Sequence, residues 1–137
     1  MPTDTLITDR IEIADLLTRF ALLLDEKRWD DADTVLAEDV TVHSPRGGEL
    51  NGLDKVVGFM RQDEVDGDHT QHTTTDLLVD VDDDQATASA NSTVYYYRDG
   101  RAPHFTGGLR QRYATTRTPA GWRIREVWIN PVWTRES

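Results

Sequence analysis

Cysteine is absent from the 137 residues of this chain, and long apolar runs are absent as well. Without cysteine the protein has no disulfide, no thiolate nucleophile and no cysteine-based zinc site. The longest uninterrupted apolar run, Phe20 to Leu24, is far too short to cross a bilayer. The N-terminus lacks a basic region followed by an apolar segment, so no secretory signal is expected and the expected location is the cytoplasm.

Basic residues are in the minority, because 15 Lys and Arg stand against 25 Asp and Glu, a formal net charge of −10. This charge repels nucleic acids and anionic membranes, so neither is expected as a partner. The sequence also lacks a glycine-rich phosphate loop and a serine-centred nucleophile elbow. His69 and His72 lie near acidic residues, but this spacing makes no closed metal site. We therefore expect neither a metal nor an organic cofactor.

The length is typical of one domain, and residues 1–137 are expected to share a single core. Apolar periodicity predicts a first helix that starts at an N-cap, Asp9, with Glu12 three residues later as in a capping box. Two shorter helices and a short strand are expected to follow, in the order helix from Asp30, strand 40–44 and helix 53–61. The second helix is expected to turn Ala32, Val35 and Leu36 inward.

The second half of the chain predicts only strands, separated by the turns DDD, DGR and TPAG. The expected strands cover residues 71–81, 85–98, 104–116 and 121–133. Short turns between long strands are typical of an antiparallel meander. The predicted fold is therefore α+β, with three N-terminal helices packed on one face of a strongly curved antiparallel sheet.

One carboxylate lies where an apolar residue is expected. Asp25 follows Leu17 and Ala14 along one stripe of the predicted first helix, at its C-terminal end. The helix dipole disfavours a negative charge there, and burial without a partner adds a further cost. Two explanations are open: an acid or base in a pocket, or a structural link to the next helix's free N–H groups, to Lys27 or to Arg28.

The order of elements, the segment RFALLLDEKRWD, the strand AEDVTVHSP and the closing GWRI resemble the SnoaL-like family, within the nuclear-transport-factor-like superfamily of cystatin-like cone folds. The resemblance extends over nearly the whole chain. It implies a sheet curved into a cone with an internal cavity. It does not select one chemistry, because similar domains are polyketide cyclases, dehydratases, ketosteroid isomerases, epoxide hydrolases or non-catalytic scaffolds.

Residues at the family's functional positions resemble a dehydratase site most. Dehydratases of the scytalone and bile-acid type have an Asp at the end of the first helix and a His at the start of the first long strand, and these match Asp25 and His72. Phe20 stands where the bile-acid enzymes have Tyr, and Tyr96 stands where scytalone dehydratase has a second His. Ketosteroid isomerases match less well, because Phe20 and Ser44 replace their Tyr and their base Asp.

The strand pattern and the resemblance disagree about His72. A carboxylate orients an imidazole and increases its affinity for a proton, which suits an Asp25–His72 pair to proton abstraction beside a carbonyl. However, the apolar Val79 occupies an odd position, whereas His72 shares the even, more polar face with Asp76. A β-bulge near residues 73–76 would turn His72 inward.

Alternation places Tyr96 more favourably than His72 for an inward side chain. Tyr96 shares the even face of its strand with small residues such as Ala88 and Ala90. Its hydroxyl is a candidate donor to a substrate carbonyl, although a run of three tyrosines is also explained by ordinary strand packing. His104 is out of phase with the apolar residues of its strand and is expected to be exposed. The other expected substrate contacts are Phe20, His43, Phe59, Trp128 and Asn130, with Asn130 and Trp128 in phase with Trp122 and Ile124.

These residues predict a cofactor-independent lyase or cyclase, of dehydratase, isomerase or polyketide-cyclase type, acting on a small hydrophobic substrate with a carbonyl group. In this hypothesis Asp25 orients His72, His72 is the general acid or base, and Tyr96 polarises the carbonyl. The alternative is a non-catalytic ligand-binding or scaffold domain in which Asp25 is structural. An exposed sheet face also predicts a homodimer through that face.

Overall fold

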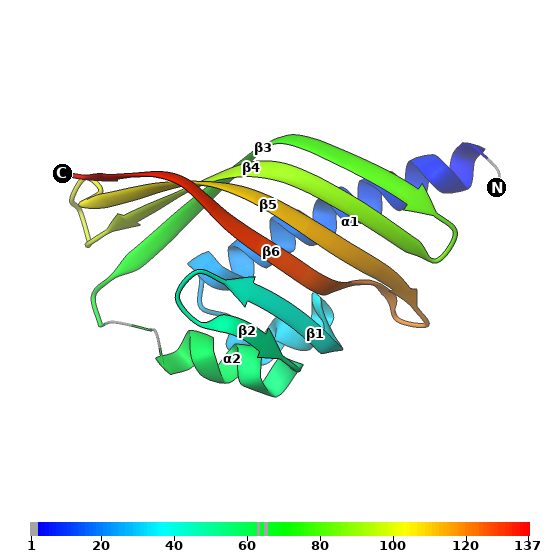
Figure 1. Ribbon diagram of the computed structural model, residues 1–137, viewed down its shortest axis with the longest axis horizontal. Helices are drawn as coiled ribbons and strands as arrows, with labels where there is room; N and C mark the ends of the chain where they lie inside the picture. Colours follow the sequence, from blue (N-terminus) through cyan, green and yellow to red (C-terminus); the bar gives the residue numbers. More distant parts are fainter. Residues whose placement is uncertain (1–2, 63, 65) are drawn as a thin grey trace.

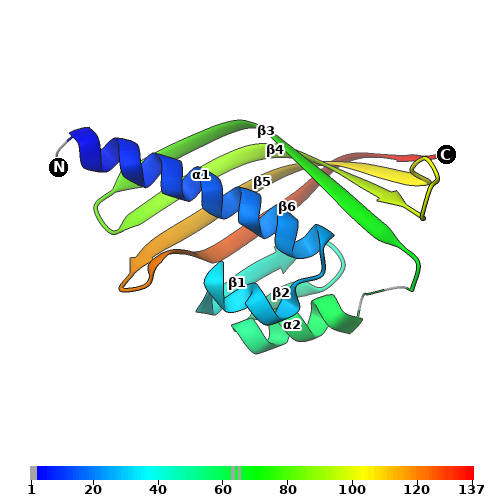
Figure 2. The same cartoon turned by 180° about the vertical axis from the view of Figure 1, so that it is seen from behind.

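A long helix lies across one face of a curved, six-stranded sheet (Figures 1 and 2). The structure is a computed structural model and describes residues 3–62, 64 and 66–137. Its helices are α1 (Thr3–Asp25), the 3-10 helix η1 (Trp29–Thr34) and α2 (Leu53–Gln62). Its strands are β1 (Leu36–Ser44), β2 (Gly48–Asn51), β3 (His69–Asp82), β4 (Gln85–Tyr97), β5 (Phe105–Thr118) and β6 (Gly121–Glu136).

The strands are ordered β2-β1-β6-β5-β4-β3 across the sheet. The four long strands β3 to β6 form the predicted antiparallel meander, and the α+β class is confirmed. The sheet as a whole is not purely antiparallel, because β1 runs parallel to β6. The segment expected to be only a turn contains β2, which pairs with β1 as a hairpin.

Helix α1 starts at Thr3, so Asp9 is not its N-cap as predicted. Asp9 is instead buried within the helix, where it accepts hydrogen bonds from Arg117 Nη1 (2.9 Å), Arg117 Nη2 (2.8 Å) and Trp122 Nε1 (3.2 Å). The Arg117 guanidinium lowers the pKa of Asp9 below its ordinary value of 3.8. The N-cap prediction failed because an Asp suits both an N-cap and a buried ion pair. The two roles differ in the partner, and Arg117 lies 108 residues further along the chain, where the local sequence cannot indicate it.

The second predicted helix is a single short 3-10 helix, η1. The N–H of Val35 bonds to the carbonyl of Ala32, three residues back, which is the 3-10 pattern. Leu36 already belongs to β1, where it pairs with Ile124 of β6. The chain therefore leaves the helix earlier than predicted, since Val35 and Leu36 become buried by joining the sheet.

The core lies between α1 and the face of the sheet that α1 covers, which we call the inner face (Figure 2). Ile13 of α1, Val40 of β1 and Ile124 of β6 are completely buried there. Small side chains on β4 also belong to this core: Ala86, Ala88 and Ala90. Helix α1 makes its closest approach to β3, where the last residue of the helix, Asp25, bonds to the backbone of His72.

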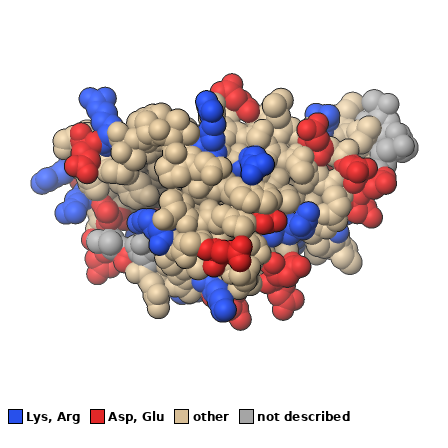
Figure 3. All heavy atoms as spheres, viewed as in Figure 1, with Lys and Arg blue, Asp and Glu red and all other residues tan. Residues whose placement is uncertain are grey.

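The opposite face of the sheet, which we call the outer face, is not covered by the helices of the described chain (Figure 1). Positive and negative side chains are interspersed over it, with neutral surface between them (Figure 3). Leu78 and Trp133 expose 70% and 49% of their surface. Among the described helices, none combines the length and the apolar composition that crossing a membrane requires.

Candidate active site

Asp25 is the last residue of α1, as the sequence predicted, and its side chain is only 16% exposed. Neither basic neighbour that could have paired with it does so. Lys27 turns away with a φ of +54° and donates to the backbone carbonyl of Asp68 (3.0 Å), while Arg28 pairs with Glu26 (3.0 Å). The partners of the Asp25 carboxylate come from β3 instead.

Three donors from one short segment of β3 hold this carboxylate. Thr70 Oγ1 donates to Asp25 Oδ1 over 3.0 Å, and the backbone N–H of His72 donates to Asp25 Oδ2 over 2.9 Å. His72 Nδ1 lies 2.5 Å from Asp25 Oδ1. These bonds compensate a negative charge at the C-terminus of a helix, where the dipole alone disfavours it. Asp25 and His72 are thus within hydrogen-bond reach, as the hypothesis requires.

A bulge in β3 turns His72 toward the helix. Thr75 pairs with Asn91 of β4 but Leu78 pairs with Ser89, so β3 has one extra residue between these two pairs. Asp76 takes up this residue with a φ of +56°, a conformation that Asp tolerates better than most side chains. The extra residue places the even-numbered His72 on the same face as the odd-numbered, buried Val79.

The conflict between strand phase and family resemblance is resolved by this bulge. Even-odd alternation without a bulge predicted that the His72 side chain points to the outer face, and that prediction is wrong. His72 is 12% exposed and lies opposite Val94 on β4, a buried inner-face residue. Its other ring nitrogen, Nε2, has no hydrogen-bond partner among residues 3–62, 64 and 66–137. An ionised Asp25 accepts a hydrogen bond from Nδ1–H, which leaves Nε2 as the nitrogen with a free lone pair.

Tyr96 lies on the inner face near this pair, as its phase predicted. It is opposite Thr70 on β3, one inner-face position along from His72 and Val94. Its ring packs edge-on against Phe105, with 5.5 Å between the ring centroids. These two aromatic rings, with Arg46 and His104, line a pocket of about 530 Å³ at the end of the sheet. Neither Asp25 nor His72 lines this pocket.

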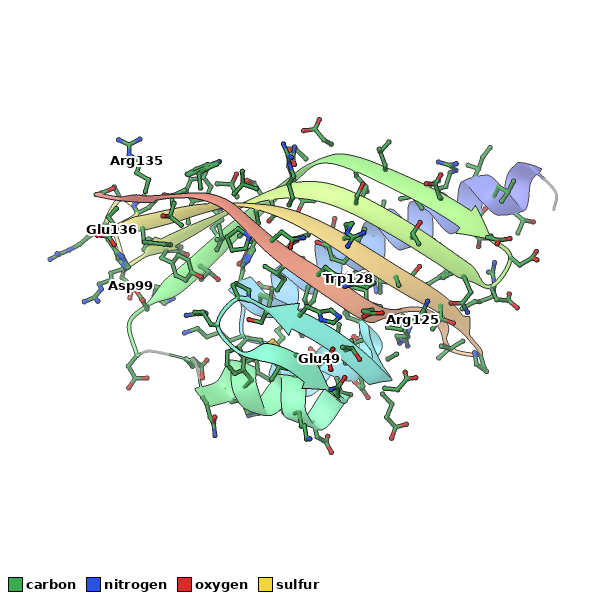
Figure 4. All side chains as sticks on the ribbon, in the orientation of Figure 1. Glu49, Asp99, Arg125, Trp128, Arg135 and Glu136 are labelled. Carbon is green, nitrogen blue, oxygen red and sulfur yellow. The ribbon has the colours of Figure 1, made fainter. Side chains whose placement is uncertain are left out.

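Three residues expected to touch a substrate lie on the outer face instead: His43, Trp128 and Asn130. The reason is a second bulge, because β6 has one extra residue, Arg125, between its pairings with Thr115 and Ala114 of β5. Trp122 and Ile124 face the core before this bulge, and Val127 faces it afterwards. Trp128 and Asn130 therefore point away from the interior, and Figure 4 shows Trp128 on the face opposite α1.

His43 is part of an outer-face cluster. Its Nε2 lies 2.7 Å from Glu126 Oε2, and its ring stacks on Trp128 with 5.4 Å between the ring centroids. Glu49 Oε1 lies 3.7 Å from the other ring nitrogen, and the Arg112 guanidinium lies 5.1 Å from the Trp128 ring. This cluster belongs to the sheet surface and does not reach the Asp25–His72 pair.

The two phenylalanines expected at the substrate site have structural contacts. Phe20 is buried and packs edge-on against Tyr113 on β5, with 6.5 Å between the ring centroids. Phe59 on α2 packs over the turn between β1 and β2, close enough to Gly47 that a side chain there would meet its ring at 2.9 Å. His104 is exposed as predicted and pairs with Asp68 (2.9 Å).

The structure adds polar interior residues that the sequence did not identify. Thr70 bonds to Asp25, and Ser92 is buried on β4, opposite Thr74. Further along β5, Tyr113 donates to Gln111 Oε1, and burial raises the pKa of Tyr113. Even-odd alternation places Thr70 on the same face as His72, but the bulge had to be known to assign both residues to the inner face. No three His, Asp or Glu side chains of the described chain converge as a metal site.

Comparison with known families decides the identity of the fold. The SnoaL-like domain matches residues 5–127, which is nearly the whole chain. The protein belongs to the SnoaL-like domain family. A search of curated proteins gives no match to this SnoaL-like domain.

Solved structures agree with the family on the fold. The Kfla4162 protein from Kribbella flavida is 23% identical, with a TM-score of 0.83 over 93% of each chain. A hexachlorocyclohexane dehydrochlorinase, LinA type 2, is 12% identical, with a TM-score of 0.82 over 96% of this chain and 90% of its own. A protein from Novosphingobium aromaticivorans, provisionally named a scytalone dehydratase, is 16% identical, with a TM-score of 0.81 over 99% and 92%. At these identities the likeness to this SnoaL-like domain concerns the fold.

Proposed function

We propose that this SnoaL-like domain is a cofactor-independent lyase or cyclase that acts on a small hydrophobic substrate with a carbonyl group. The observation that carries the proposal is the half-buried contact between Asp25 and His72, with the second imidazole nitrogen left without a partner among the described residues. Structural pairs of Asp and His are common at surfaces. This pair is unusual in this chain because it lies on the inner face, below the end of α1.

The proposed reaction begins with proton transfer. Asp25 accepts a hydrogen bond from the Nδ1–H of His72, which keeps its proton, and Nε2 takes a proton from the carbon beside the substrate carbonyl. The electron pair of the broken C–H bond moves into the carbonyl to give an enolate. In an elimination this pair then expels a leaving group on the next carbon, and imidazolium His72 returns its proton to that group. In a ring closure the enolate carbon attacks a second carbonyl instead, and the proton goes to the new alkoxide.

Tyr96 is the proposed donor to the carbonyl oxygen. It lies one inner-face position along the sheet from His72, on the neighbouring strand, where diagonal residues are ~7–8 Å apart. That separation accommodates a carbonyl group and its neighbouring carbon between the phenol and the imidazole. A hydrogen bond from Tyr96 would stabilise the negative charge that develops on the oxygen. The names of two structural relatives, a dehydrochlorinase and a dehydratase, denote eliminations and support this class of reaction.

Proton exchange tests the proposal without knowledge of the natural substrate. The wild type is incubated in D₂O with a panel of small hydrophobic ketones and β-hydroxyketones, and NMR follows deuterium uptake beside the carbonyl and loss of water. We expect exchange or elimination with at least one member, above the rates without protein. Binding of panel members with neither exchange nor turnover would contradict the enzyme proposal.

A ligand-binding scaffold is the second candidate, and one observation favours it. The pocket of about 530 Å³ is lined by Tyr96 and Phe105 but not by Asp25 or His72. In a scaffold the Asp25–His72 contact would serve only to join α1 to β3. The D₂O experiment separates the two candidates, because a scaffold binds a ligand without exchanging its protons.

We also propose that the outer face pairs with a second copy of this chain. A two-fold axis sets the same patch of each copy against the other, so a patch with both charges can complement itself. His43 contacts Glu49 and Glu126 and stacks on Trp128, and Arg112 lies over the Trp128 ring. Figure 4 shows Glu49 and Trp128 on this face. Aromatic residues and Arg are enriched at the centres of such interfaces.

Light scattering tests this pairing. We expect a mass of twice the 15.6 kDa chain for the wild type and a monomer for Trp128→Glu, because the substitution removes the central aromatic ring and adds a third carboxylate around His43 at the interface. The matched control is Ile11→Ser, which removes an exposed apolar side chain from α1 and leaves the dimer unchanged. A monomeric wild type would overturn the proposal.

A further inference from the structure

The Asp25 carboxylate is held at both oxygens, but the two ends are held differently. Oδ2 accepts the backbone N–H of His72 (2.9 Å), a bond that no side-chain substitution removes. Oδ1 is shared by His72 Nδ1 (2.5 Å) and Thr70 Oγ1 (3.0 Å). The Thr70 hydroxyl is therefore the one side-chain donor, apart from His72 itself, that bonds this carboxylate among the described residues.

We propose that Thr70 is a positioning residue, whose hydroxyl fixes the Asp25 carboxylate so that Oδ1 faces His72 Nδ1 and the imidazole keeps its proton on that nitrogen. This inference rests on the proposed function for its consequence in catalysis, but not for its structural content. A carboxylate that ends a helix can rotate about its last side-chain bond, and one backbone donor alone does not fix that rotation. The imidazole is the group being oriented, so Thr70 supplies the donor on Oδ1 that does not depend on the tautomer of His72.

The residue type suits this task. Thr is stiff at χ1, so its hydroxyl is held in place by the backbone of β3. An ionised carboxylate accepts bonds and cannot donate, so Thr70 must give its proton to Asp25. With Oδ1 held in place by Thr70, the carboxylate stays aligned to accept the Nδ1–H of His72, and Nε2 is the nitrogen that exchanges protons.

The position of Thr70 follows from the bulge. Thr70 and His72 are two residues apart on β3, so their side chains lie on the same face of the sheet. The register with β4 shifts further along the strand, between Thr75 and Leu78. Without the extra residue at Asp76, both side chains would leave the inner face together. The donor and the imidazole are therefore a unit whose orientation is set by one feature of the strand.

The test uses the nitrogen-15 chemical shifts of the His72 imidazole, which report the tautomer whether or not a substrate is known. We expect the wild type to hold the Nδ1–H tautomer. Thr70→Val, which has the same shape without the hydroxyl, is expected to populate the Nε2–H tautomer as well. Thr70→Ser is expected to restore the wild-type spectrum in part, because it returns the hydroxyl without the stiffness. Thr73→Val, on the outer face of the same strand, is the matched control.

Activity adds an independent measurement once a substrate is found. Loss of a hydrogen bond to a charged group is worth about tenfold or more. We expect Thr70→Val to lower kcat by roughly that factor with KM unchanged, because the hydroxyl orients Asp25 and does not touch the substrate. If Thr70→Val unfolds, Thr70→Ala supplies the same comparison. A His72 spectrum that is identical in wild type, Thr70→Val and Thr70→Ala would overturn the inference, and it would leave the proposed function standing.

Discussion

Replacement of Asp9 with Ala is expected to lower the free energy of unfolding by about 3 kcal/mol, the lower end of the cost of breaking a buried ion pair. Asp9 is 2% exposed and joins α1 to the far end of the chain through Arg117 and Trp122. In Asp9→Ala, the indole N–H of Trp122 loses its acceptor inside the core. Arg117 retains Asp84 (3.0 Å) as a partner, which is why the lower end of the range applies. Urea unfolding followed by Trp fluorescence measures the change.

Substitution of the partner, Arg117, distinguishes the cost of an unpaired buried charge from the cost of lost packing. Arg117→Met leaves the Asp9 carboxylate in the core without its cation, and we expect a loss of about 5 kcal/mol. Asp15→Ala is the matched control, because Asp15 is an exposed Asp on the same helix, and its loss should change stability by less than about 0.5 kcal/mol. Equal midpoints for Asp9→Ala and Asp15→Ala would show that the network contributes nothing.

The pH dependence of stability follows from the same contact. The folded pKa of Asp9 lies below its ordinary value of 3.8, so the folded state binds its proton less readily than the unfolded state. The pair's contribution is therefore complete above that value, and it is lost as the pH falls through the lowered folded pKa. Asp9→Asn is expected to remove this part of the acid slope. An unchanged slope between wild type and Asp9→Asn below about pH 4 would contradict this linkage.

The strands were predictable because long alternating segments and polar turns leave few alternatives, and β3 to β6 match the expected meander. The faces of the strands were less predictable. Alternation assigns a face only while every residue advances the strand by one step, and the extra residues at Asp76 and Arg125 break that rule. Each bulge reverses the phase, so His72 was expected outside and Asn130 inside, and the structure has the opposite.

Nothing in the local sequence distinguishes these bulges from ordinary strand. Asp76 tolerates a positive φ and accepts a bond from Asn91 Nδ2 (3.0 Å), but Asp residues are frequent in this chain. Family resemblance supplied the information that periodicity lacked, because it assigned Asp25 and His72 to one site regardless of strand phase. The buried partners of Asp9 were hidden for a related reason, since sequence separation conceals contacts between α1 and β5.

The largest effect on activity is expected from His72→Ala, which should lower kcat/KM by about 10²–10⁴-fold, the range that general acid–base catalysis contributes. The reason is that, among the described residues, His72 is the one histidine that bonds to Asp25, so no other imidazole can replace it as the base. Asp25→Asn should give a loss of similar size, because the amide N–H can donate a hydrogen bond to Nδ1 and so favour the tautomer with its proton on Nε2. The measurement is kcat/KM on whichever substrate the D₂O panel identifies.

The matched control for both variants lies on the same strand. His69 Nε2 is 2.8 Å from Asp99 Oδ1, so it is also a His paired with an Asp, but its odd position places it on the outer face and away from Asp25. His69→Ala and Asp99→Asn should therefore leave kcat/KM within about twofold, whereas the inner-face pair controls the reaction. Equal losses from the two pairs would indicate a general effect on β3. Unchanged turnover in both His72→Ala and Asp25→Asn would exclude this pair from catalysis, because a base that accepts the substrate proton cannot be removed without slowing that step.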